Sequence, residues 1–159
     1  MNQKFKECLS EVYLGEQAGE MVFEILLATA QDDNQRYIFS NMLQFETEGK
    51  AIMRPLLVKL GIPIEENKAL RNQGHEIAES LKGITFKEQF ENIYQSVKNY
   101  YLPQYEELST LVDEGDSEAY YIANFMGEHE RSILLAADNI IKEKADPVQP
   151  IRELLKFPI

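Results

Sequence analysis

Apolar residues recur every three or four positions through four long stretches of the chain. This spacing places them on one face of an α-helix. We therefore expect helices at about 3–30, 33–60, 85–113 and 117–144. No stretch of useful length shows the alternation of apolar and polar residues that a β-strand requires. The pattern predicts an all-α protein.

The connections between these stretches predict how the helices are joined. The breaks at 31–34 and 113–117 are short and polar, whereas the connection at 61–84 is long and contains an amphipathic piece at 69–81. A short, long, short order is typical of two antiparallel helix hairpins joined by a crossover along a four-helix bundle. We expect one domain over 1–159.

The bundle core of this domain is expected at about 3–144, followed by the tail 145–159, which carries a short C-terminal helix. The tail is apolar enough to dock on the bundle or on a second subunit, so the sequence allows either a monomer or a homo-oligomer. Pro55 and Pro103 fall inside helical patterns, and a proline there usually kinks a helix. Because the apolar face continues through both, we expect bent helices, with division into two as the alternative.

Acids and an imidazole interrupt the apolar faces near the middle of three helices. These residues are Glu16 with Glu20 one turn on, then Glu46, and then the adjacent pair His129 and Glu130. Antiparallel hairpins of this length place the helix midpoints at one level, so we expect the groups to meet. Burying a carboxylate is costly unless something pairs with it. In a helix bundle the usual candidate for several acids at one level is a metal ion.

The layout resembles the ferritin-like superfamily, which includes rubrerythrin-type and other di-iron carboxylate bundles. The resemblance covers about residues 3–144 and rests on the helix lengths, the crossover and the mid-helix acids. It implies Glu16 or Glu20 as the ligand from the first helix, Glu46 from the second and Glu130 from the fourth. It also implies iron or manganese as the cofactor.

The chain departs from the ligand pattern of that family, in which two helices each carry a Glu-x-x-His motif. Gly49 stands three residues after Glu46, and Ile133 stands three residues after Glu130. His129 lies at a different offset, and the third helix offers tyrosines at its centre. This favours a degenerate di-iron site in a non-catalytic binding or interaction protein. The alternative is an iron- or manganese-binding oxidoreductase that uses the Glu/His layer.

Each of these residues also has a structural interpretation. Glu46 can pair with a tyrosine across the bundle or with His129. His129 and Glu130 project about 100° apart on a helix, so they cannot face the bundle axis equally. Gly19 and Gly49 lie on core faces, where they either allow close helix approach or leave room for a small ligand.

Tyrosines concentrate in the second hairpin, where we expect them to pack with their hydroxyls at the surface or on a buried acid. The alternative is a polar, aromatic pocket or a redox-active tyrosine near a metal. They are Tyr94, Tyr100, Tyr101, Tyr105, Tyr120 and Tyr121. The expected inward face of the last helix includes Tyr121 and Phe125.

Charge and composition exclude some partners. The net charge is −11, from 27 acidic and 16 basic residues, and 44% of the residues are hydrophobic. Nucleic acid and anionic membranes need a basic face, so we expect neither as a partner. Cys8 is the only cysteine, no secretory signal is visible at the start, and no apolar run is long enough to cross a bilayer. We expect a soluble cytoplasmic protein.

Overall fold

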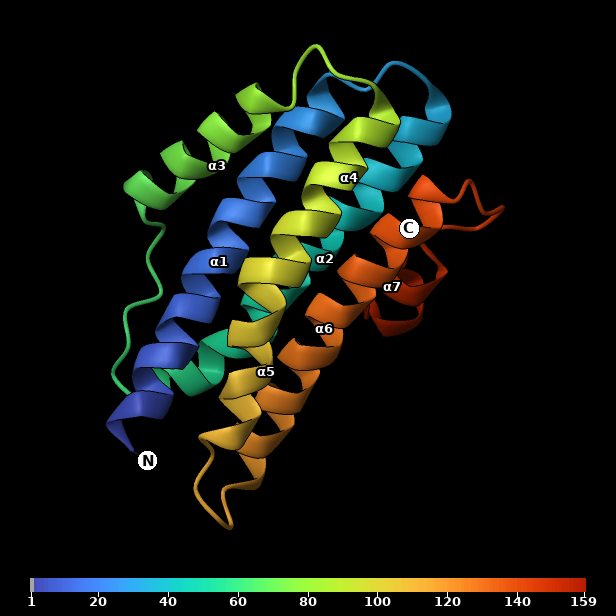
Figure 1. The fold of residues 1–159 in the computed structure, drawn as a ribbon. Coiled ribbons are helices and arrows are strands. Elements are labelled where there is room, and N and C mark those ends of the chain that lie inside the picture. The colour runs from blue at the N-terminus through green and yellow to red at the C-terminus, as the bar shows by residue number, and fades with distance from the viewer. Residues whose placement is uncertain (1) are drawn as a thin grey trace.

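The computed structural model describes residues 2–159, and over this range it contains helices and no β-strand (Figure 1). The helices are α1 (Gln3–Ala28), α2 (Asp33–Lys59), α3 (Lys68–Ser80), α4 (Phe86–Ser96), the π-helical turn η1 (Val97–Tyr101), α5 (Leu102–Thr110), α6 (Ser117–Ile141) and α7 (Gln149–Leu154). The prediction of an all-α protein is confirmed. No helix in the described range is both long and apolar enough to cross a membrane.

Two helical hairpins lie side by side in Figure 1. The first consists of α1 and α2, and the second consists of α6 with the consecutive segments α4, η1 and α5. The long connection returns along the outside of the first hairpin, where α3 packs against α1. This arrangement brings the middles of α1, α2 and α6 together inside the bundle.

Side chains at the helix starts explain why the helices begin where they do. A side-chain oxygen accepts a backbone N–H of the first turn in five helices, and each such cap stabilises a helix by about 1 kcal/mol. The caps are Asn2, Asp32, Asn67, Thr85 and Asp116. Asp32 and Asp116 lie in the two short breaks that the sequence predicts between helices.

The two prolines have different surroundings. Helix α2 continues through Pro55. The third long segment instead contains the π-helical turn η1, directly before α5, whose second residue is Pro103. A proline ring clashes with the carbonyl four residues earlier in a regular α-helix, and that residue lies inside η1. The wider turn therefore accommodates Pro103 without ending the helix, and the segment is neither a regular bent helix nor two separate ones.

Buried apolar side chains form two clusters, which lie on either side of the mid-bundle polar residues. One cluster includes Phe23, Phe39, Phe90 and Ile140. The other includes Phe5, Leu9, Leu56, Leu108 and Met126. The prediction that Tyr121 faces inward is wrong, because its side chain is 54% exposed. Phe125 is buried as predicted. The residues of α6 that are buried at this end are Ala119, Ile122, Ala123, Phe125 and Met126.

The C-terminal tail docks on its own bundle, which is one of the two positions that the sequence allows. Helix α7 packs against α6 and α2, and Ile151 is fully buried. After α7, the backbone amides of Lys156 and Phe157 donate hydrogen bonds of 2.6 and 2.9 Å to the carboxylate of Glu48 on α2. The tail therefore completes the core of this chain.

Candidate metal centre

Four ionisable side chains from three helices are buried in the middle of the bundle. Glu16 comes from α1, Glu46 from α2, and His129 and Glu130 from α6; none is more than 5% exposed. Glu16, His129 and Glu130 each offer a ligand atom, and the three atoms lie within 4.8 Å of one another. We call the four residues the polar layer.

The adjacent residues His129 and Glu130 are both buried, on different sides of α6. The ring of His129 stacks on Phe45 of α2, with ring centroids 3.8 Å apart. Its Nε2 lies 3.1 Å from the Phe45 carbonyl oxygen and 3.5 Å from Glu16 Oε2. Glu130 lines a cavity that the second hairpin helps to form, and a ligand atom of its carboxyl group lies within 4.8 Å of a ring nitrogen of His129. Helix α6 packs against α2 as well as α4 and α5, so both directions lead into the interior.

Glu16 is the residue that links the layer to the second hairpin. Its Oε1 accepts a hydrogen bond of 2.7 Å from the hydroxyl of Tyr105 on α5. Its Oε2 has no hydrogen-bond partner, and neither does His129 Nδ1, although both atoms are buried. A buried polar atom without a partner is costly, so these two atoms call for an explanation.

Two glycines make room for the carboxyl groups. A Cβ atom on Gly49 would overlap Glu16 Oε2, and one on Gly19 would lie 2.7 Å from the carboxyl group of Glu46. The nearest atoms to both glycines therefore belong to polar side chains of the facing helix. The room at Gly49 is taken by the carboxyl group of Glu16 and that at Gly19 by the carboxyl group of Glu46, rather than by a small ligand as one interpretation of the sequence suggests.

Burial controls the protonation of the layer. It raises the pKa of Glu130 to about 8 and lowers that of His129 to about 4. Burial also raises the pKa of Glu16 and Glu46 well above the usual value, and the negative charges of neighbouring acids add to this effect. Without a cation, the layer is therefore stable mainly in its uncharged form near neutral pH.

Glu20 lies outside the group of three ligand atoms and has its own partners. It forms a salt bridge with Lys50, which is 3% exposed, and accepts a hydrogen bond of 2.7 Å from the Thr47 hydroxyl. Lys50 also pairs with Glu66. The sequence reasoning missed Lys50, although it follows Glu46 by one helical turn and therefore shares its face of α2. The ammonium group of Lys50 would therefore compete with a metal ion for the carboxylate of Glu20.

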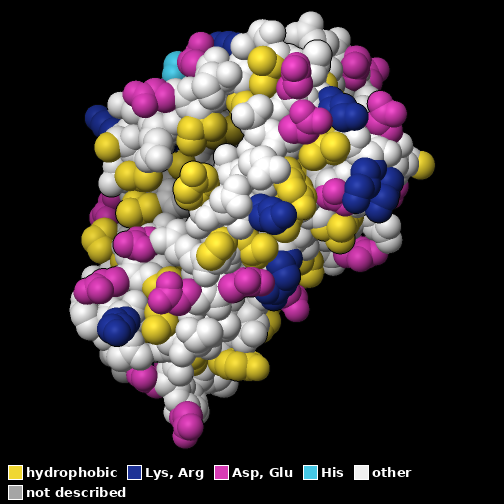
Figure 2. Space-filling model, viewed as in Figure 1, with side chains coloured by type: hydrophobic (Ala, Val, Ile, Leu, Met, Phe, Trp, Pro, Cys, Tyr) yellow, Lys and Arg dark blue, Asp and Glu magenta, His cyan; other side chains and the backbone are white. Residues whose placement is uncertain are grey.

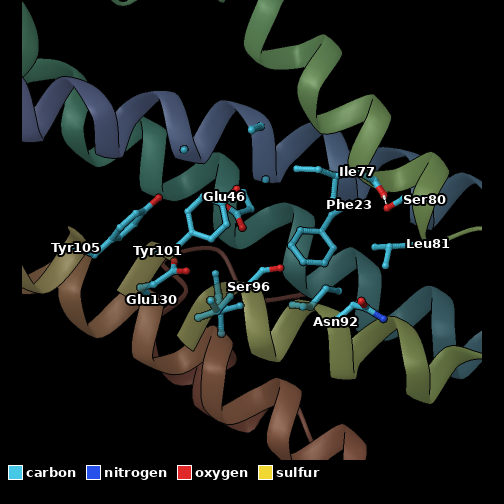
Figure 3. Close-up of a pocket in the computed structure, with 16 residues that line it drawn as sticks. Phe23, Glu46, Ile77, Ser80, Leu81, Asn92, Ser96, Tyr101, Tyr105 and Glu130 are labelled. Atoms are coloured by element: carbon cyan, nitrogen blue, oxygen red, sulfur yellow. Dashed lines mark hydrogen bonds between the residues drawn. The ribbon is translucent and has the colours of Figure 1, made fainter. Parts of the chain in front are cut away.

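A cavity of about 250 Å³ adjoins the polar layer. Figure 3 shows Glu46, Glu130, Tyr101 and Tyr105 gathered at one end of it. Apolar side chains from α1, α3, α4, η1 and α6 form the walls, and they include Phe23, Ile77, Leu81, Ile93, Val97 and Ile133. In the space-filling view, hydrophobic side chains gather on this face between α3 and α4 (Figure 2). The sequence signals for this space are glycine on a core face and the tyrosines of the second hairpin, of which Tyr101 and Tyr105 line the cavity.

No protein family model, no curated protein and no solved structure matches the chain.

Proposed function

We propose that this chain is a divergent ferritin-like bundle that binds one divalent transition metal ion in the polar layer. The observation that carries the proposal is the convergence of Glu16, His129 and Glu130 within 4.8 Å. Glu46 lies outside this group of three, but it is buried, and close enough to Glu16 and Glu130 for their charges to add to the effect of burial in raising its pKa, and we assign it as the fourth donor. Carboxylate and imidazole donors together suit iron, manganese or zinc.

The number of donors supports one ion. Two-metal sites in ferritin-like bundles use four glutamates and two histidines. The polar layer has three glutamates and one histidine, and the third long segment contributes Tyr101 of η1 and Tyr105 of α5 at the adjoining cavity. Glu20 does not add a donor, because Lys50 holds its carboxylate. Four donors are enough for one ion and too few for two.

The unpartnered atoms favour a metal over a purely structural network. If hydrogen bonds alone satisfied the layer, His129 Nδ1 would have a partner, and it has none. Glu16 Oε2 also has none unless Glu46 is protonated and donates a hydrogen bond to the Glu16 carboxyl group. A cation would also offset the cost of ionising three buried carboxyl groups that stand close together. The metal-free alternative is supported by the Tyr105–Glu16 hydrogen bond and by the raised pKa values of the acids, which allow an uncharged layer.

The surrounding side chains would fix the donors in place. Tyr105 orients the carboxyl group of Glu16, and the stacked ring of Phe45 holds the imidazole of His129. Bound iron or manganese would supply redox chemistry, and zinc would supply Lewis acidity. We propose binding of the ion only. An oxidoreductase would also need a substrate.

A competition titration with Mn²⁺, Fe²⁺ and Zn²⁺ tests the assignment of donors. Glu16→Gln and Glu130→Gln are expected to weaken binding at least a hundredfold, because each removes a charged ligand. Glu20→Gln is the matched control and is expected to bind as the wild type does. Loss of binding in Glu20→Gln with retention in Glu16→Gln would refute this ligand set.

A further inference from the structure

We propose that the cavity beside the polar layer binds a small organic amine, with its ammonium group against Glu46 and Glu130 and its apolar body along the walls. This inference goes beyond metal binding. Because Glu46 and Glu130 are also proposed metal donors, an amine and a metal ion are alternative occupants of these two carboxyl groups. It rests on the distribution of charge, the apolar walls and the size of the cavity.

The charge of the lining selects for a cation. The 16 lining residues include two carboxyl groups, Glu46 and Glu130, and no lysine, arginine or histidine. Lys50 does not line the cavity, and its ammonium group is held by Glu20 and Glu66. A carboxylate or phosphate ligand would therefore meet two acids with no counter-charge. An ammonium group would offset the cost of the buried acids and could donate to both of them.

The tyrosines at the same end extend the polar region. Figure 3 shows Tyr101 and Tyr105 beside Glu46 and Glu130. Because the hydroxyl of Tyr105 donates to Glu16, its oxygen can still accept a hydrogen bond from a ligand. A primary ammonium has three N–H donors, which matches two carboxyl groups and one phenol oxygen.

The walls and the volume define the rest of the ligand. Phe23, Leu81, Val97 and Ile133 are buried apolar side chains of the lining. A cavity of 150 Å³ holds benzene, so the 250 Å³ here accommodate about ten heavy atoms. Alkyl or arylalkyl amines with about six to nine carbons fit this space.

The entrance lies between α3 and α4. Ser80 and Asn92 are exposed at the edge of the lining, whereas Glu46 and Glu130 are buried at its inner end. Helix α3 forms one wall because it lies very close to α1: a Cβ on Gly74 would lie 2.5 Å from the Ala18 carbonyl oxygen. The lining is therefore polar at the entrance, apolar along the walls and acidic at the inner end.

Calorimetric titration of the chelator-treated protein with n-octylamine, 1-octanol and octanoate tests the proposal, because the three share an apolar body. We expect one equivalent of the amine to bind, at least tenfold more tightly than the alcohol, and octanoate not to bind. Binding of octanoate as tight as that of the amine would overturn the proposal, and so would the absence of amine binding.

Two variants locate the bound amine. Val97→Phe fills the cavity and is expected to abolish amine binding while leaving metal uptake intact; Val58→Phe, at an exposed position of α2, is the matched control. Glu46→Gln keeps the shape of the side chain and removes its charge, so it is expected to reduce the preference for amine over alcohol at least tenfold. This test does not require Val97→Phe to fold. An unchanged preference in Glu46→Gln contradicts the proposal.

Because the amine titration uses metal-free protein, the two proposals can fail separately. Amine binding without metal uptake would refute only the metal proposal, and metal uptake without amine binding would refute only the amine proposal.

Discussion

Replacing Glu130 with glutamine is expected to change how the stability of the metal-free protein depends on pH. Burial raises the pKa of Glu130 from 4.5 to about 8 in the folded state. Between these two values the folded protein keeps a proton on this carboxyl group that the unfolded chain releases. The contribution of Glu130 to the free energy of unfolding therefore decreases as pH rises through this range.

The magnitude follows from the width of that range. Each pH unit changes the free energy of unfolding by about 1.4 kcal/mol for one such proton. Between pH 5 and pH 8 the wild type is therefore expected to lose roughly 4 kcal/mol relative to Glu130→Gln. Glutamine has the shape of the protonated acid and does not titrate. The lowered pKa of His129 acts in both proteins and largely cancels in the difference.

Urea unfolding of both proteins at several pH values, with chelator present, measures this difference. Glu128→Gln is the control on the same helix; its carboxylate is exposed, so the variant should follow the wild type across the range. If the curves of wild type and Glu130→Gln stay parallel from pH 5 to pH 8, Glu130 is not held protonated by burial and the electrostatic argument fails.

Three further substitutions, one of them paired with a control variant, test individual contacts. Gly49→Ala is expected to lower the free energy of unfolding and to prevent metal uptake, because its Cβ would overlap the carboxyl group of Glu16. Gly127→Ala is the control: the nearest side-chain atom to its Cβ is 3.4 Å away, so it should stabilise the protein by up to about 1 kcal/mol. Urea unfolding compares the two variants. Tyr105→Phe removes a buried hydrogen bond and should cost about 1–3 kcal/mol in the same assay. Glu48→Gln weakens the acceptor of the amides at 156–157, so their hydrogen exchange should accelerate while that of the α2 amides does not.

The helices and the level of the acids could be predicted from the sequence because both follow from helical periodicity. Glu16, Glu46 and Glu130 each lie near the middle of a long helix, and antiparallel hairpins of similar length bring such positions together. The connection lengths indicated which helices form hairpins. Helical periodicity and connection lengths were sufficient to predict these features.

Features that depend on packing between helices could not be predicted. Whether His129 and Glu130 are both buried depends on how many neighbours surround α6, and a single helix does not reveal this. The π-helical turn η1 reflects how the backbone adapts before Pro103. The cavity is lined by residues of several helices, and the sequence of any one of them does not reveal how these helices pack together.

Metal content of the untagged protein tests the central claim most directly. The protein would be purified without chelator from cells grown with iron, manganese and zinc, and measured by plasma mass spectrometry before and after reconstitution. We predict one equivalent of a divalent transition metal per chain. No metal after reconstitution, or two equivalents per chain, would contradict a single ion held by Glu16, Glu46, His129 and Glu130.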